Sequence, residues 1–222
     1  ALASCNLNTS QSLPSNDTVR QASDATYSIN PDQSIIVWTG REVTTSKHFG
    51  NIYFASGQFE VKSGLISSGE FVVDMTTIDN QDLPEERRPR LEAHLKSDDF
   101  FSVESHPTAL LSILSSESMS EGKWLVSGEL TIKTFTHPVE FEMLNSNDGW
   151  KANLVFDRSK YDVKYASGSF FKNLGDKLIL NEIELSQTLN LINMKSNLNK
   201  PKCGCGNTND LNGYCDGSHS NK

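Results

Sequence analysis

The stretch "WLVSGELTIKT", residues 124–134, decides the fold class, because nonpolar and polar residues alternate along it one by one. The first face carries Val126, Gly128, Leu130 and Ile132, and the second carries Ser127, Glu129, Thr131 and Lys133. Successive side chains of a β-strand point to opposite sides, so this period of two predicts a strand with one buried and one wet face.

The same alternation recurs on both sides of this stretch. It is seen in residues 69–79, 138–144, 149–159 and 178–192, and three further apolar runs cover residues 28–40, 51–61 and 106–117. Turn sequences such as "SSG", "SEG" and "NDG" separate most of the runs. About eight antiparallel strands with one apolar face each close best as an up-and-down barrel, which leaves no sheet edge exposed. Such a barrel either fills its interior with side chains or holds one small ligand.

One stretch, "DLPEERRPRLEAHLKSDDFF" at residues 82–101, breaks the alternation. Asp82 and Glu85 have the spacing of a capping box. Leu91 and Leu95 fall on one helical face, and Pro89 is expected to kink or restart the helix. We therefore expect one helix, which covers the barrel mouth.

The bulk composition limits the classes of function. The chain has 222 residues, a formal net charge of −8 and 36% hydrophobic residues. Acidic net charge argues against nucleic acid as the main partner. No run of eighteen apolar residues occurs, so no transmembrane helix is expected.

The amino-terminal residues Leu2, Ala3, Ser4 and Cys5 match the cleavage site of a bacterial lipoprotein signal peptide. A stretch rich in Ser, Asn, Gln and Asp follows, with the composition of a tether. We interpret residues 1–25 as signal remnant and tether, with Cys5 as the lipidated residue that anchors the protein to a membrane on the periplasmic side of a bacterial cell envelope. The alternative is a chance match in a disordered terminus.

The carboxy-terminal residues 194–222 form a linker and a short cysteine-rich tail, "CGCGNTNDLNGYCDGSH". Three thiolates and one imidazole are available from Cys203, Cys205, Cys215 and His219. Such a donor set suits zinc or an iron–sulfur cluster equally well. A disulfide with one thiol left over is the alternative without a metal.

Within residues 26–193, the segments "VWTGREVTTSKHFGNIYFASGQFEV", "RLEAHLKSDDFFSVESHPTALL" and "VSGELTIKTFTHPVEFEM" resemble the YceI-like family in order and spacing. The resemblance implies an all-β, eight-stranded antiparallel, lipocalin-like barrel. It also implies that the interior binds a long isoprenoid chain, either an isoprenoid lipid or an isoprenoid quinone. Many members of that family are periplasmic.

Candidate ligand-binding residues follow from the alternation and the expected lid. The apolar candidates are Phe54, Phe71, Met75, Leu130, Phe141 and Phe156 in the interior, with Leu91, Leu95 and Phe101 in the lid. His48 and Arg158 are polar candidates for contact with a head group. The alternative is that the apolar set packs the core and the polar residues are solvated.

The tail resembles the CDGSH iron–sulfur family, which implies a [2Fe–2S] cluster on the three cysteines and His219. The gap between the second and third cysteines is one residue longer than usual in that family. Its clusters usually come in pairs, which suggests a homodimer. We see no catalytic constellation and expect a non-enzymatic carrier; a redox protein that couples the cluster to a quinone or a partner protein is the alternative.

Overall fold

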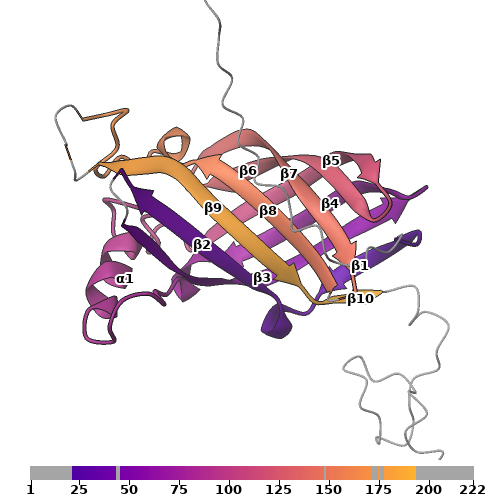
Figure 1. Cartoon of the computed structure of the whole chain (residues 1–222), viewed down its shortest axis with the longest axis horizontal. Coiled ribbons are helices and arrows are strands. Elements are labelled where there is room, and N and C mark those ends of the chain that lie inside the picture. The colour runs from indigo at the N-terminus through magenta and orange to yellow at the C-terminus, as the bar shows by residue number, and fades with distance from the viewer. Residues whose placement is uncertain (1–21, 44–45, 148, 172–174, 176–177, 194–222) are drawn as a thin grey trace, which may run out of the picture.

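The computed structural model describes residues 22–43, 46–147, 149–171, 175 and 178–193 (Figure 1). Its strands are β1 (Ala25–Ile29), β2 (Ile35–Glu42), β3 (Lys47–Lys62), β4 (Leu65–Asp74), β5 (Thr108–Ser120), β6 (Lys123–Ile132), β7 (Phe135–Ser146), β8 (Gly149–Asp157), β9 (Ile179–Leu189) and β10 (Leu191–Asn193). The helices are α1 (Arg88–Lys96) and the 3-10 turns η1 (Pro31–Gln33), η2 (Met75–Thr77) and η3 (Arg158–Tyr161).

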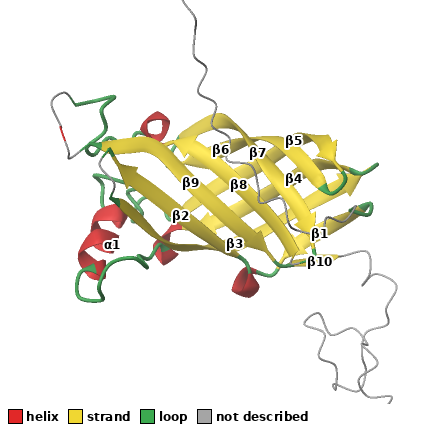
Figure 2. Cartoon of the chain, in the orientation of Figure 1, coloured by secondary structure: helices red, strands yellow, loops and turns green. Residues whose placement is uncertain are grey.

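Eight of the strands form a closed antiparallel barrel, as the alternation predicted (Figures 1 and 2). Each strand from β2 to β9 pairs with the next one along the chain, and β9 returns to pair with β2. Closure gives every barrel strand two hydrogen-bonded neighbours, which removes the exposed edges of an open sheet.

Two runs that the sequence presented as single strands are each split in two. Residues 28–40 contain η1 between β1 and β2, and Asn190 separates β9 from β10. The two breaks lie side by side, because Asn30 N donates to Asn190 O at 2.8 Å and Asn190 N donates to Ser34 Oγ at 3.0 Å. The short strands β1 and β10 pair with each other, and β1 also pairs with the second half of β3.

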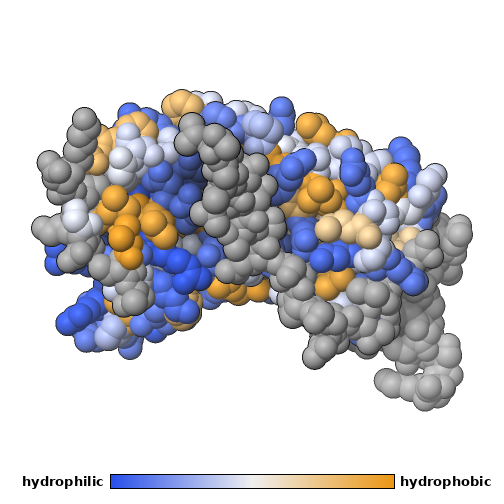
Figure 3. All heavy atoms as spheres, turned by 45° about the horizontal axis from the view of Figure 1, so that its top comes forward, coloured by the Kyte–Doolittle hydropathy of each residue, from blue (hydrophilic) through white to orange (hydrophobic). Residues whose placement is uncertain are grey.

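The alternating residues point as predicted. Val126, Leu130 and Ile132 of β6 are buried, whereas Glu129 between them is exposed. In β8, Trp150, Ala152, Leu154 and Phe156 are all buried. The outer surface mixes hydrophilic and hydrophobic residues on the face seen in Figure 3. The inner face of the sheet therefore supplies the core.

Two local predictions were wrong. Met75 does not continue the alternation of β4, since that strand ends at Asp74 and Met75 begins η2, where its buried side chain still faces the interior. Asp82 and Glu85 do not cap α1, because the helix begins at Arg88, six residues after Asp82. The N-cap residue is Arg87, whose side chain makes no capping hydrogen bond. Pro89 stands in the first turn of α1, where a missing N–H costs nothing, so it starts the helix without kinking it.

Among the described residues, no helix combines the length and the apolar character needed to cross a membrane.

Candidate functional site

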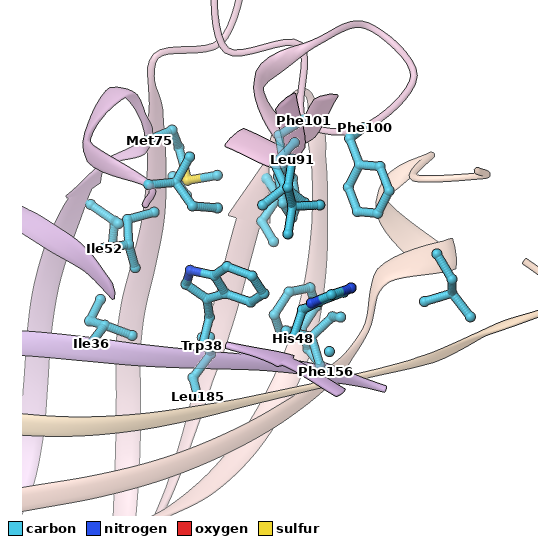
Figure 4. Close-up of a pocket in the computed structure, with 18 of the residues that line it drawn as sticks. Ile36, Trp38, His48, Ile52, Met75, Leu91, Phe100, Phe101, Phe156 and Leu185 are labelled. Carbon is cyan, nitrogen blue, oxygen red and sulfur yellow. The ribbon is translucent and has the colours of Figure 1, made fainter. Parts of the chain in front are cut away.

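A cavity of about 320 Å³ lies inside the barrel beneath α1 (Figure 4). Side chains of β2 form one wall, including Ile36 and Trp38, and residues from the segment between β4 and β5 form the wall that faces them. The lining is mainly aliphatic and aromatic, as is usual for pockets that bind apolar small molecules.

A second, smaller hollow of about 40 Å³ lies further along the barrel. Its lining includes Phe54, Phe71, Phe141 and Leu154 and contains one polar side chain, Gln187. The two hollows have four lining residues in common: Ile36, Val73, Leu130 and Leu185. The shared walls make these two hollows neighbouring parts of one apolar interior.

All the ligand-binding residues predicted from the sequence except Arg158 line one or both of the hollows. Met75, Leu91, Leu95, Phe101, Phe156 and His48 line the main cavity, Leu130 lines both hollows, and Phe54, Phe71 and Phe141 line only the smaller one. Arg158 lines neither hollow. The structure therefore brings the apolar candidates together around two adjoining hollows.

Arg158 instead lies fully buried behind the wall, where its guanidinium donates four hydrogen bonds. The acceptors are the backbone carbonyls of Val163, Tyr165, Ile179 and Leu180, at 2.8 to 3.1 Å. These bonds join the segment after η3 to the start of β9. Burial lowers the pKa of Arg158 from its ordinary value, but a guanidinium stays charged in proteins. The four carbonyls leave little donor capacity for a ligand head group.

His48 lies at the mouth of the cavity and is held by Asp82. The carboxylate of Asp82 accepts from Phe49 N at 2.9 Å and lies 2.8 Å from His48 Nδ1. Burial raises the pKa of Asp82, but hydrogen bonds from Phe49, His48 and Asn80 together lower it below its ordinary value. Asp82 thus fastens the segment before α1 to β3.

Gly50 allows this close approach. A Cβ at Gly50 would collide with the backbone of Asp79, whose carboxylate also accepts from Asn51 N at 2.7 Å. The carbonyl of Asp79 accepts from Trp38 Nε1 at 3.0 Å. The segment that carries the lid is therefore fixed to both β2 and β3.

Sequence reasoning missed several lining residues. Trp38, Ile36, Ile52 and Tyr165 line the cavity, and none was singled out as a candidate. The alternation in residues 35–38 places Ile36 and Trp38 on one face, so their inward direction was available from the sequence. Tyr165 lies in an irregular segment, where no period signals direction.

Exposed hydrophobic side chains surround the end of the barrel that carries α1. Val43, Phe135, Tyr165, Phe170 and Phe171 are each 40–56% exposed; Phe135 is the first residue of β7, and the other four lie in connections between strands at this end. Val43 N donates to Leu178 O at 2.9 Å, which places the β2–β3 connection beside the segment between β8 and β9. Tyr165 belongs both to this rim and to the cavity lining.

The predicted metal ligands Cys203, Cys205, Cys215 and His219, and the predicted lipidation site Cys5, lie outside the described residues. Within the part of the chain that the structure does describe, no group of three or more His, Cys, Asp or Glu residues is placed to hold a metal ion.

A comparison with family models matches residues 27–191 to the YceI-like domain. The chain belongs to the YceI-like family. The matched range begins within β1 and ends at the first residue of β10, so the match includes all eight strands of the closed barrel, β2 to β9.

Two solved structures share the fold. BcnA from Burkholderia cenocepacia superposes with a TM-score of 0.58 at 16% identity, covering 74% of this chain and 99% of that protein. A polyisoprenoid binding domain from Saccharophagus degradans, implicated in plant cell wall breakdown, gives 0.50 at 11% identity, covering 77% and 99%. A comparison with curated proteins finds no match.

Proposed function

We propose that this YceI-like protein is a non-enzymatic carrier that holds a long apolar isoprenoid lipid or isoprenoid quinone inside its barrel. The observation that carries the proposal is the apolar interior of the barrel, with a cavity beneath α1 and a smaller hollow that shares four of its lining residues. Burial of apolar ligand surface against such walls contributes roughly 25 cal/mol per Å² to the free energy of binding, so a hydrocarbon chain is stabilised in proportion to its buried area. The similar fold of a protein described as a polyisoprenoid binding domain supports the same ligand class.

The rim at the mouth suits the transfer of such a ligand. Exposed large hydrophobic residues that gather in one place mark surfaces for contact with apolar partners. Tyr165 connects the rim with the cavity, so a chain leaving a lipid surface would pass from one apolar environment to another.

The test is to identify what the purified protein holds. Organic extraction followed by mass spectrometry is expected to release a long isoprenoid compound from the wild type. Leu130 is the variant position of choice because it lines both hollows, and Leu130→Trp is expected to reduce the bound lipid at least tenfold.

The matched control is Glu129→Trp, on the exposed face of the same strand, which should retain its lipid. Extraction of no lipid from the wild type, together with no uptake of added isoprenoid, would contradict the carrier function.

For the tail, we propose a [2Fe–2S] cluster held by Cys203, Cys205, Cys215 and His219. The chemistry of the donor set supports it, since three thiolates and one imidazole suit soft metals. The cluster would supply one-electron redox chemistry, and a histidine ligand raises the potential relative to all-cysteine ligation. Zinc on the same residues is the competing outcome.

An absorption spectrum with iron and sulfide assays on anaerobically purified protein separates the two metals. Visible bands that shift in His219→Cys, with equal amounts of iron and sulfide, are the expected result. A colourless protein that binds zinc alone would replace this part of the proposal.

A redox protein is the second candidate function, because the sequence combines a candidate cluster with a barrel that could hold a quinone. Anaerobic mixing of the reduced protein with a short-chain quinone tests it. We expect the quinone to reoxidise the cluster of the wild type, and we expect Leu130→Trp to slow this reaction. A homodimer, measured by light scattering, would bring two tails together.

We also propose that Cys5 carries lipid and anchors the protein on the periplasmic side of a bacterial cell envelope. The sequence around Cys5 and the polar stretch after it support this proposal. Expression in bacteria supplied with labelled fatty acid, compared with Cys5→Ser, tests it, and label that persists in the variant would contradict it.

A further inference from the structure

The connection between β8 and β9 presents three aromatic rings to solvent. Tyr165, Phe170 and Phe171 are 46%, 46% and 49% exposed, although they lie close together in the chain. Figure 1 shows that the start of β9 and α1 lie at the same end of the barrel. Single exposed hydrophobic residues are normal, but several large ones in one place mark a contact surface.

Hydrogen bonds fasten the turn that carries the two phenylalanines to β9. The carbonyl of Ser167 accepts from Phe170 N at 3.1 Å and from Phe171 N at 3.0 Å. The hydroxyl of Ser167, a fully buried residue, donates to Asn181 Oδ1 at 2.7 Å. Asn181 Nδ2 in turn donates to Ser169 Oγ at 2.7 Å. Because the barrel holds the backbone of this turn, the fold itself places the two rings at the surface.

The rings adjoin the mouth of the cavity. Tyr165 lines the cavity, as does Ile179 at the start of β9. Ile179 N donates to Ala166 O at 2.9 Å, which places the aromatic segment directly beside that wall. Val43, which is 56% exposed, lies in the neighbouring β2–β3 connection. A partner that covers the rings therefore also meets the mouth of the cavity.

Lysine side chains border the same segment. Lys164 Nζ lies 5.5 Å from the centre of the Phe170 ring, and Lys133 Nζ donates to Asp162 O at 3.1 Å. Lys160 is exposed in η3. A lysine can lay its methylene groups along an apolar surface and keep its ammonium in water, as residues at membrane interfaces do. The carboxylate of Asp162 pairs with Lys164, so we expect the rings to contribute more to a contact than the lysines.

These features favour a lipid bilayer over a second protein as the partner. Aromatic rings flanked by lysines match the interfacial layer of a membrane, where apolar chains and charged head groups meet. A bilayer is also the phase that stores apolar lipids, and the cavity lies next to the rings. A folded protein seated on the rim would instead cover the mouth.

We propose that the rim docks on a phospholipid bilayer, with the rings of Phe170 and Phe171 in the headgroup layer and the ammonium groups of Lys160 and Lys164 at the lipid phosphates. The mouth of the cavity then faces the membrane. This contact is separate from any lipid on Cys5, and it gives the barrel a defined orientation. The inference rests on the carrier function proposed above and names the surface and the partner through which the ligand is exchanged.

Flotation with lipid vesicles tests the contact. The full chain carries Cys5→Ser so that no lipid anchor contributes, and the vesicles contain two parts of phosphatidylcholine to one part of phosphatidylglycerol. We expect Phe170→Ser combined with Phe171→Ser to weaken binding about tenfold or more, because two half-exposed rings lose their apolar contact. The matched control is Leu114→Ser combined with Met119→Ser, two exposed residues of β5, which should change binding by less than about twofold.

The lysines are tested on the same vesicles. Lys160→Gln combined with Lys164→Gln is expected to weaken binding about twofold to tenfold, and to have almost no effect on vesicles of pure phosphatidylcholine, because the attraction needs an anionic surface. Lys62→Gln is the control, since Lys62 is exposed at the opposite end of the barrel. An equal effect of Lys62→Gln would overturn the placement of the lysines at the membrane.

A fluorescence measurement reports whether the rim enters the bilayer. Phe170→Trp adds an indole at the rim, whereas the native tryptophans Trp38, Trp124 and Trp150 are all buried. We expect its emission to shift to shorter wavelength on vesicles and to be quenched by brominated phospholipid. Met119→Trp, on β5, should show neither change. Thermal unfolding checks that all variants remain folded.

Vesicle binding that is unchanged in the phenylalanine variant would overturn the docking surface. A wild-type dimer that this variant abolishes, together with no vesicle binding, would assign the rim to a second copy of the chain. A protein that carries isoprenoid but does not bind vesicles would remove only this inference. A protein that binds vesicles through the rim but holds no isoprenoid would keep the docking surface and contradict the carrier function.

Discussion

Arg158 offers a sharp test of how the barrel is held together. The variant Arg158→Met keeps most of the length of the side chain and removes the guanidinium. Four carbonyl acceptors, those of Val163, Tyr165, Ile179 and Leu180, then lose their donor. Hydrogen bonds to charged groups contribute about 1.5–3 kcal/mol each, so simple addition gives about 6–12 kcal/mol.

The real loss will be smaller than that sum. Removal of a buried charge also removes its desolvation cost, and water can reach some of the carbonyls once the segment relaxes. We expect the free energy of unfolding of Arg158→Met to fall by about 3–4 kcal/mol, close to the cost of breaking a buried ionic network. With a urea m-value of about 2 kcal/mol per molar, the midpoint falls by about 1.5–2 M.

The assay is urea denaturation followed by circular dichroism. Lys160→Met is the control because Lys160 is an exposed residue of the same 3-10 turn, and it should change stability by less than about 0.5 kcal/mol. A loss below about 1 kcal/mol in Arg158→Met, with a cooperative transition, would refute the structural role. A stable variant that binds ligand poorly would instead assign Arg158 to the head group, as the sequence first suggested.

Three more predictions concern the lid and the titrating groups. Asp82→Asn is expected to lose about 1–2 kcal/mol of stability at neutral pH. Because the pKa of Asp82 is lowered in the folded state, the difference in stability between wild type and Asp82→Asn should be constant above about pH 4 and should vanish in acid. Urea denaturation midpoints measured across this pH range check it. Gly50→Ala is expected to cost about 1–3 kcal/mol in the same assay because its Cβ meets the backbone of Asp79, whereas Gly40→Ala, with room for a Cβ, should be tolerated. Burial raises the pKa of Tyr161 to about 12, so stability is lost as pH rises from about 10 toward 12, and Tyr161→Phe should flatten that decline.

Much of the fold could be predicted because the barrel is built from local periodicity. Each strand needs only to present one apolar face, and the buried residues of β6 and β8 show that the period of two was sufficient to find that face. The breaks between β1 and β2 and between β9 and β10 were not found. They depend on hydrogen bonds that join Asn190 to Asn30 and Ser34, from which it is distant in the chain.

The lid shows a second reason for error. Asp82 has the residue type and spacing of a helix cap, but tertiary contacts with His48 and Phe49 on β3 use its carboxylate instead. A short polar side chain satisfies whichever donors the folded chain brings to it, and sequence spacing does not report donors from another strand.

The sequence by itself determined the class of this protein: strands of period two, one helix between them, and inward faces made of apolar residues. These follow from the direction of side chains along a strand, which each segment decides locally. Only the tertiary structure decided which inward residues line a cavity and which fill the core, and that the guanidinium of Arg158 bonds backbone carbonyls of the wall. Those outcomes depend on how distant segments fill space together, because packing and hydrogen-bond satisfaction are properties of the whole fold.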